Sequence, residues 1–276
     1  MEINQGNLMT ICIAALCEDS QKVVVTSDKM LTAGMLSIQF EHPESKIIEI
    51  TKTCVIMTAG AGLRQTELVT ALKKQISGLV TSTVPDIVEK IKDIYQKARL
   101  KKAEELYLKP IGLTLSDFPR QAQFLSPDVS MSLNEQISSY DYGIEIIVAG
   151  VDNEGGHIYF IGNPGTSECF DSIGYFQIGS GEPHAAQCFI ENSYSQKANL
   201  YDALWAVYNG KKRAENAPGV GKAGEFAIIG NDKILYLEDS VLKELEKLRS
   251  ENESIKDQYF KNEVSPKLTS IKFGTE

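Results

Sequence analysis

The beginning of the chain alternates between short apolar or β-branched runs and polar turns. Residues 10–17 and 23–27 are two such runs. Turn-forming residues 18–20 separate them, so the pattern predicts a β-hairpin. Residues 46–50 alternate toward a third strand, and residues 53–59 form a fourth apolar run that ends at glycines. The chain is therefore expected to open with strands.

The hydrophobic period then lengthens to three or four residues, which predicts helices. One helix is predicted from Arg64 through Leu79. A second is predicted from Pro85, a favoured first-turn residue, to about Leu106. The second half of the chain repeats this order with a hairpin, a strand, two helices and two closing strands. Their predicted ranges are 144–152, 157–161, 174–179, 182–190, 200–213, 226–230 and 234–237.

Three segments are less regular. Residues 1–9 have no periodicity and are interpreted as a leader or propeptide. Residues 109–140 contain three prolines and few periodic apolar positions, so we expect an irregular insertion with a short strand at 111–115. The tail, residues 241–276, begins with leucines at every third position among many charges. It predicts a short amphipathic helix, too short for a coiled coil, and a frayed end. The main domain is then residues 10–240.

The order of elements predicts the fold class. Hairpins imply antiparallel sheets, each with one face to cover. Two packed sheets with a pair of helices outside each would bury every apolar face. We therefore expect an α+β protein, a four-layer α-β-β-α sandwich, in one domain.

Composition narrows the function classes. The 276 residues are 42% hydrophobic and 24% charged, an ordinary globular balance. A net charge of −9 argues against a nucleic-acid partner, and the basic run 97–102 is interpreted as a solvated helix face. The longest apolar runs fall far short of the ~20 residues of a membrane span, and no signal peptide is recognisable.

The cysteines and histidines bear on the cellular compartment and on metal binding. Five scattered cysteines without a CxxC pair predict free thiols in a reducing compartment, hence a cytoplasmic location. Three histidines lie far apart and form no cluster with cysteines, so no metal and no cofactor are expected.

The junction between Met9 and Thr10 carries a specific chemical hypothesis. Removal of Met9 would leave Thr10 with a free α-amino group beside its own hydroxyl. The two groups form a self-contained base and nucleophile. Translation could begin at Met9, because methionine aminopeptidase tolerates a small second residue such as threonine, and no self-cleavage would then be needed. Taken alone, a threonine that opens a strand reflects only ordinary β-propensity.

Five short motifs in order resemble a known family. They are Thr10-x-x-x-Ala14, Ser27-Asp28-x-x-x-Thr32-Ala33-Gly34, Lys46-Ile47-x-Glu49-Ile50, Ala59-Gly60 and Gly179-Ser180-Gly181. This series resembles proteasome β-type subunits and, more closely, the stand-alone bacterial and archaeal proteasome-like proteins of the N-terminal-nucleophile hydrolase superfamily. The resemblance covers roughly residues 10 to 238, without the insertion and the tail, and it implies the sandwich fold described above.

The resemblance implies a role for each of five catalytic candidates. Thr10 would be the nucleophile, with its freed amine as proton acceptor. Lys46 would favour the neutral form of that amine, and Asp28 would keep Lys46 charged and oriented. The backbone N–H of Gly60 would serve the oxyanion hole. Ser180 would hydrogen-bond the region of the Thr10 amine and relay protons. Each residue also has a structural interpretation, as a turn, cap or strand-edge residue.

The sequence departs from the family pattern in three places. Proteasome β precursors usually carry glycine before the threonine, where this chain has Met9. The family's Ser-Gly-Asp region should lie near residues 218–222, which contain no aspartate. Glu215 or Glu225 could take its place, although neither is favoured. The insertion and the charged tail are not standard for ring-forming β subunits.

The leading hypothesis is a threonine-type N-terminal-nucleophile amide hydrolase, a proteasome-like peptidase. It would act on a peptide or protein substrate and self-associate into a homo-oligomer or ring. An ester on Thr10 would be resolved by water or, in a transpeptidase or ligase, by another amine. One alternative is an inactive proteasome-like scaffold or assembly subunit. Another is a small-molecule amidase that uses Cys12 or Cys17, although a buried structural thiol is the favoured interpretation of Cys12.

Overall fold

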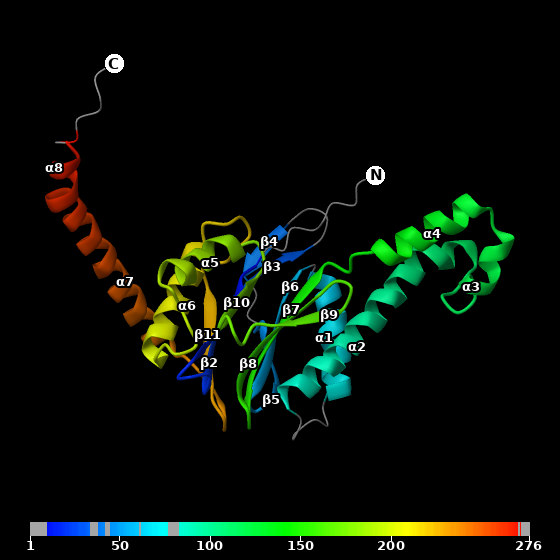
Figure 1. Ribbon diagram of the computed structural model, residues 1–276, viewed down its shortest axis with the longest axis horizontal. Coiled ribbons are helices and arrows are strands. Elements are labelled where there is room, and N and C mark those ends of the chain that lie inside the picture. The colour runs from blue at the N-terminus through cyan, green and yellow to red at the C-terminus, as the bar shows by residue number, and fades with distance from the viewer. Residues whose placement is uncertain are drawn as a thin grey trace, which may run out of the picture. The chain divides into compact units, whose positions relative to one another are not determined.

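Two antiparallel sheets of five strands organise the larger of the chain's two compact units, Met1–Tyr236 (Figure 1). The computed structural model describes residues 10–33, 38–41, 45–60, 62–76, 83–269 and 271. The first sheet has the order β10 (Tyr175–Ile178), β1 (Cys12–Cys17), β2 (Lys22–Asp28), β11 (Gly224–Ile229) and β12 (Ile234–Tyr236). The second has the order β5 (Ile47–Thr51), β6 (Cys54–Gly60), β7 (Ile144–Asp152), β8 (Gly155–Gly162) and β9 (Thr166–Cys169).

The inner faces of the two sheets pack against each other. Side chains alternate along each strand with a period of two, so Cys12, Ala14 and Leu16 of β1 point to one face. They share a core cluster with Met57 of β6 and Ile147 of β7, which belong to the second sheet. The predicted hairpin of residues 10–27 is therefore confirmed, and it lies at the centre of the core between the sheets.

Helices cover the outer face of the second sheet. Ile56 and Ile146 lie on that face and pack with Leu68 of α1 (Gly62–Ile76) and Ile91 of α2 (Val84–Ala103). Figure 1 shows α1 and α2 beside this sheet. A capping box begins α2, because Thr83 accepts from the Asp86 amide while the Asp86 carboxylate accepts from the Thr83 amide.

The other helix pair contacts the first sheet. α5 (Glu182–Glu191) packs against α6 (Leu200–Ala214), and α6 contacts β1 and β2. The side chain of Asn199 accepts from the Asp202 amide at 2.9 Å and caps the start of α6. The predicted α+β class, with two antiparallel sheets and helices, is confirmed.

The segment predicted as an irregular insertion, residues 109–140, is largely helical. It contains α3 (Phe118–Gln121) and α4 (Pro127–Ser139). Only Ile137 of α4 is buried, so the segment lacks the apolar stripe by which a helix is recognised in a sequence. The buried Arg99 side chain holds the end of α4, because it donates to the carbonyls of Ile137, Ser138 and Tyr140. A cation at the last carbonyls of a helix is favourable.

The prediction of a short strand at residues 111–115 was wrong. Lys109–Ile111 forms a 3-10 turn, and Gly112 ends it in the left-handed region with φ of 76°. This conformation at residues 111–112 interrupts the extended backbone that a strand over residues 111–115 requires. The nearby Leu113 and Leu115 pack instead, partly buried, against the core under α2.

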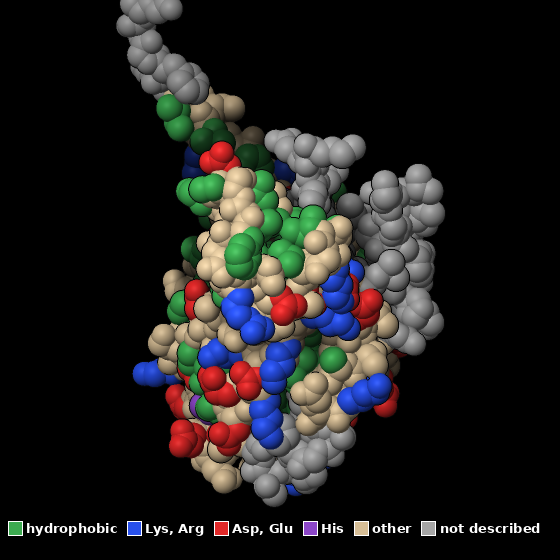
Figure 2. Space-filling model, turned by 90° about the vertical axis from the view of Figure 1, so that its right-hand side faces the viewer, with side chains coloured by type: hydrophobic (Ala, Val, Ile, Leu, Met, Phe, Trp, Pro, Cys, Tyr) green, Lys and Arg blue, Asp and Glu red, His purple; other side chains and the backbone are tan. Residues whose placement is uncertain are grey.

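Exposed apolar side chains collect along this helical segment. Ile111, Phe124, Val129 and Met131 are all exposed, and Phe124 retains 77% of its accessible surface. Figure 2 shows hydrophobic side chains gathered on the upper part of this face, above a field of mixed lysine, arginine and acidic residues. Lys97 and Lys101 of the basic run 97–102 are exposed, as the interpretation of a solvated helix face requires, but Arg99 of the same run is buried.

Other differences concern elements that the sequence pattern did not predict. The hairpin of β3 (Met30–Ala33) and β4 (Ile38–Glu41) and the short strand β9 were missed. Most of β9 is exposed, so it has no apolar alternation to reveal it. The predicted leader, residues 1–9, lies outside the described residues. The same holds for the end of the helix predicted to Leu79.

The second unit, Leu237–Glu276, contains α7 (Asp239–Tyr259) and α8 (Ser265–Leu268). The tail was predicted to form a short helix, but α7 has 21 residues. Ion pairs three or four residues apart, such as that between Arg249 and Glu253, support it beyond its leucines. Among the described residues, no helix is both long and apolar enough to cross a membrane.

His157 of β8 contacts two carboxylates, that of Asp152 at the end of β7 and that of Asp171 in the turn after β9. Its Nδ1 lies 2.7 Å from Asp171 and its Nε2 3.2 Å from Asp152. Asp152 in turn accepts from the Val84 amide at the start of α2. The hydrogen bond with Asp171 is the main reason that the pKa of His157 is raised above its ordinary 6.5, although burial opposes the shift.

We expect His157→Gln to remove one component of the pH dependence of stability. A histidine whose pKa is raised in the folded state stabilises the fold at a pH below its ordinary pKa. This stabilisation is lost as the pH rises through the raised pKa. Urea unfolding of the native chain should therefore show a fall in unfolding free energy above pH 6.5 that is smaller in the variant. Equal slopes in the two proteins would contradict the charged state of His157.

Candidate active site

The carboxylate of Asp28, the last residue of β2, is completely buried and accepts donors on both oxygens. Oδ1 accepts from the Thr10 hydroxyl, from the Ile11 amide at 3.2 Å and from Lys46 Nζ at 2.8 Å. The hairpin register explains the first two contacts, because Cys12 pairs with Ser27 and so places the residues just before β1 beside Asp28. The carboxylate therefore fixes the start of the hairpin to Lys46.

Thr10, Asp28 and Lys46 form one buried cluster. Lys46 Nζ donates to Thr10 Oγ1 at 2.5 Å as well as to Asp28, and the Thr10 hydroxyl donates to Asp28. Thr10 is 3% exposed and Lys46 is 5% exposed. The structure thus brings together three of the five residues that the motifs single out, with a cation and an anion in contact with one hydroxyl.

Glu225, in β11, holds the backbone that carries Lys46. Its Oε1 accepts from the amides of Lys46 at 2.8 Å and Ile47 at 3.1 Å, and from the Ser45 hydroxyl at 2.6 Å. It also accepts from the Ser27 hydroxyl beside Asp28. Because β11 belongs to the first sheet and β5 to the second, Glu225 ties the two sheets together next to the cluster.

The loop before β11 completes the binding of Asp28. Gly221 donates its amide to Asp28 Oδ2 at 2.8 Å, and the Met30 amide does so at 3.3 Å. The buried Lys211 of α6 donates to the carbonyl of Lys222 and pairs with Glu215 at 2.5 Å. Glu215 therefore neutralises the buried Lys211 ammonium.

The remaining two candidates are Gly60 and Ser180, and the contact with Thr10 comes from Gly181, the neighbour of Ser180. The Gly181 amide donates to the Thr10 carbonyl at 3.3 Å, so the turn after β10 touches the Thr10 backbone. The Ser180 hydroxyl donates to the Pro218 carbonyl at 3.0 Å and not to Thr10. Gly60 ends β6 with φ of 136°, and a Cβ there would stand 2.3 Å from the Gly143 carbonyl oxygen. The predicted roles of Gly60 and Ser180 remain predictions.

The geometry adds a second carboxyl that the motifs did not single out. Glu145 of β7 receives a hydrogen bond from the Gly179 amide, and Gly179 packs against the Thr10 carbonyl. Burial, with a smaller contribution from repulsion by Glu182, raises the pKa of Glu145 to about 7. A carboxyl group close to the cluster is therefore able to hold or release a proton near neutral pH.

The positions of Glu145 and Glu225 in their strands could have identified both residues from the sequence. Glu145 has the same parity as Ile147 and Ala149, and Glu225 has the same parity as Ala227 and Ile229. These apolar neighbours all lie in the core between the sheets. A charged residue at an inward position of a strand is unexpected for packing, and it indicates a buried polar partner.

The cysteines are poorly suited to act as nucleophiles. Cys12 and Cys17 are buried, and burial raises the pKa of Cys17 to about 12 and that of Cys12 further. The reactive species of a cysteine is the thiolate. These thiols therefore stay protonated at neutral pH, which agrees with their interpretation as structural residues.

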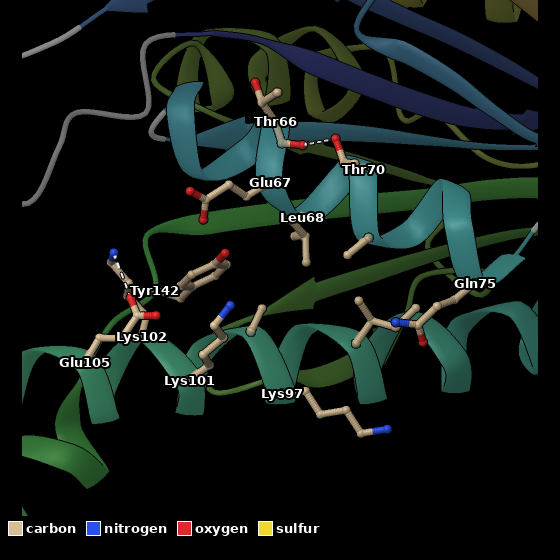
Figure 3. Close-up of a pocket in the computed structure, with 13 residues that line it drawn as sticks. Thr66, Glu67, Leu68, Thr70, Gln75, Lys97, Lys101, Lys102, Glu105 and Tyr142 are labelled. Atoms are coloured by element: carbon tan, nitrogen blue, oxygen red, sulfur yellow. Dashed lines mark hydrogen bonds and ion pairs between the residues drawn. The ribbon is translucent and has the colours of Figure 1, made fainter. Parts of the chain in front are cut away.

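A separate groove lies between α1 and α2, with a volume of about 800 Å³. Figure 3 shows its polar rim, in which Lys101 of α2 points toward Tyr142 and toward Glu67 of α1, whereas Lys97 points away from both. None of the five predicted site residues lines this groove. Within the described residues, no group of histidine, cysteine and acidic side chains is arranged to hold a metal ion.

Comparison with known proteins supports a relationship at a coarse level. No protein-family model matches the chain. The chain is similar to the proteasome subunit alpha type-2 of Trypanosoma brucei brucei, with 27% identity over 126 residues. The aligned region covers 42% of this chain and 51% of that protein, so the chain spans about half the length of this curated relative. The similarity supports a proteasome-like relationship, but to a subunit of the alpha type, whereas the motifs resemble the beta type.

We expect Asp28→Ala to destabilise the first unit strongly. It leaves the Lys46 ammonium buried without its carboxylate, and breaking a buried pair from one side costs about 3–5 kcal/mol. The double variant Asp28→Ala/Lys46→Met removes both charges and should lose less stability than Asp28→Ala alone. Denaturant unfolding of the native chain, Asp28→Ala, Lys46→Met and the double variant measures this difference. A double variant as unstable as the sum of its single variants would show that the pair does not act as a unit.

Proposed function

We propose that this chain is a threonine-type N-terminal-nucleophile amide hydrolase of the proteasome-like kind, with Thr10 as its nucleophile. The observation that carries the proposal is the buried contact of Lys46 Nζ with both Thr10 Oγ1 and Asp28 Oδ1. In the same proposal, the two sheets and their outer helices form a four-layer α-β-β-α sandwich. The similarity to a proteasome subunit supports the proteasome-like part of this proposal.

The proposed chemistry requires that Met9 be removed. The Thr10 hydroxyl would then attack an amide carbonyl while the freed amine takes the hydroxyl proton. Lys46 would disfavour a second positive charge on that amine, and Asp28 would keep Lys46 in place. The Gly60 amide would stabilise the oxyanion. Collapse breaks the C–N bond, releases the protonated amine product and leaves an ester on Thr10, which water resolves to the acid.

Assembly, substrate and location follow from the proposed relationship. The similar protein is by name a subunit of a proteasome, which supports self-association into a homo-oligomer or ring for this chain. A peptide or protein is the proposed substrate class, and the cytoplasm is the proposed location. Transfer of the acyl group to another amine, in place of water, would make the chain a transpeptidase by the same first step.

A specific observation favours a second candidate function, a noncatalytic proteasome-like scaffold or assembly subunit. The similar protein is of the alpha type, not of the beta type to which the Thr10 motif points. A second observation agrees with it, because the Ser180 hydroxyl is bound to Pro218 rather than to Thr10. The scaffold would use the Thr10, Asp28 and Lys46 cluster only to join the hairpin to β5.

The first test is the intact mass and N-terminal sequence of protein made from its native gene, followed by labelling with a peptide epoxyketone. This probe needs both the hydroxyl and the free amine of an N-terminal threonine. The hydrolase predicts a chain that begins at Thr10 and is labelled. Thr10→Ala should abolish labelling, and Thr10→Ser should retain it.

The opposite results separate the two candidates. A chain that keeps residues 1–9 and is not labelled would leave the Thr10 nitrogen in a peptide bond, which supports the scaffold. A chain that keeps these residues while hydrolysing peptides would overturn the assignment of the Thr10 amine as the base. Normal stability of Thr10→Ala shows that lost labelling is not a folding defect.

A further inference from the structure

Helix α7 of the second unit exposes an apolar stripe. None of its residues is buried, and Leu248, Ile255 and Tyr259 are 45%, 65% and 61% exposed. An amphipathic helix on a globular surface normally buries its apolar stripe. Within the described residues nothing buries the part of this stripe from Leu248 to Tyr259. The spacing of its residues indicates which kind of partner would bury it.

The stripe has the spacing of a coiled coil over the whole length of α7. Its members recur at alternating intervals of four and three residues, which is the heptad period. They are Val241, Leu245, Leu248, Asn252, Ile255 and Tyr259. In heptad notation, Leu245, Asn252 and Tyr259 occupy a positions, and Val241, Leu248 and Ile255 occupy d positions. The helix is ~32 Å long at 1.5 Å per residue, enough for three heptads.

The charges beside the stripe are arranged for a parallel partner. The g positions hold Glu244 and Glu251, and the e positions of the following heptads hold Arg249 and Lys256. In a parallel pair a g residue meets the e residue of the next heptad in the partner. Glu244 then meets Arg249, and Glu251 meets Lys256, in both directions. An antiparallel pair would instead bring glutamates together.

The contacts between two helices require Arg249 to give up only exposed ion pairs within its own helix. In the single chain, Arg249 pairs within the helix with Glu253 at 2.5 Å and with Glu246 at 3.8 Å. Exposed pairs of this kind stabilise a helix only slightly. Exchange of one of them for a contact with Glu244 of a second copy therefore loses little.

We propose that α7 pairs with α7 of a second copy of this chain, parallel and in register, as a short two-stranded coiled coil. Asn252 supports two strands and one register, because a single asparagine at an a position pairs with itself across the seam. This outweighs Leu245 at a and Ile255 at d, a combination more common in larger bundles. The pairing goes beyond the proposed function and does not depend on Thr10.

The first experiment tests register and direction by cross-linking the full chain. Cys169 is the exposed cysteine and is changed to serine, while the other four are buried. Asn252→Cys places one thiol from each copy at the seam, where paired a positions suit a disulfide. Oxidation with glutathione disulfide should link two chains. The matched control, Ser250→Cys, lies at an outward f position and should link much less.

Three outcomes overturn the proposal. They are no linked pair from Asn252→Cys, an equal yield from Ser250→Cys, or a linked yield unchanged when Ile255→Lys is added. With the seam broken by a lysine in each chain, the linked fraction should fall by about tenfold or more, which corresponds to about 1.4 kcal/mol. A helix of some other protein as the true partner would give the first outcome.

The second experiment tests the charge pattern. In the Asn252→Cys background, Glu251→Lys places like charges at both contacts with Lys256 and should slow cross-linking at low salt. The swap Glu251→Lys/Lys256→Glu should restore the rate. Asp257→Lys makes the same change of charge at an outward position and should have little effect. Failure of the swap to restore pairing, or an equal effect of Asp257→Lys, would overturn the parallel arrangement.

A control keeps this proposal separate from the proposed function. In the Asn252→Cys background, a chain that also carries Thr10→Ala should cross-link as well as one that keeps Thr10. A chain that retains Thr10, is inactive and still pairs would refute only the hydrolase, whereas an active chain that does not pair would refute only the coiled coil.

Discussion

The buried carboxylate of Asp28 is the constraint on which the rest of the described site depends. A buried carboxylate without partners is costly, so the fold must bring donors to it from several directions. Those donors come from the residues before β1, from the start of β3, from the residue before β5 and from the loop before β11. They are Thr10, Ile11, Met30, Lys46 and Gly221. One side chain, at the end of β2, is thus the point at which these four segments of the chain meet.

The sequence predicted the parts of this arrangement that are local or periodic. Apolar runs around the turn at residues 18–20 predicted the hairpin, and the motifs placed Asp28 and Lys46 near Thr10. Strand pairing carries residues at the start of β1 to the end of β2, so the contact of Thr10 with Asp28 follows from the hairpin. Lys46 reaches Thr10 from the segment before β5, which belongs to the other sheet. The alpha-type similarity supports only the coarser, proteasome-like part of the functional prediction.

What the sequence could not predict depends on contacts between distant segments. Glu225 and Lys46 are far apart in the chain, and only the packing of the two sheets brings the carboxylate to the Lys46 amide. The helices within residues 109–140 were missed for a related reason, since Arg99 of α2 holds the end of α4. The length of α7 was missed because apolar residues beyond Leu248 are widely spaced and separated by charges.

The two sheets are open rather than closed, and their outermost strands are short. β10 and β12 have four and three residues, and β5 and β9 have five and four, whereas the inner strand β7 has nine. A long bare edge would offer unpaired amides and carbonyls to the edge of another molecule, and such addition can continue without limit. Short edges leave little to extend. Growth into amyloid-like fibres is therefore discouraged, and copies of this chain are left to meet through side chains on their helices, where contacts are finite.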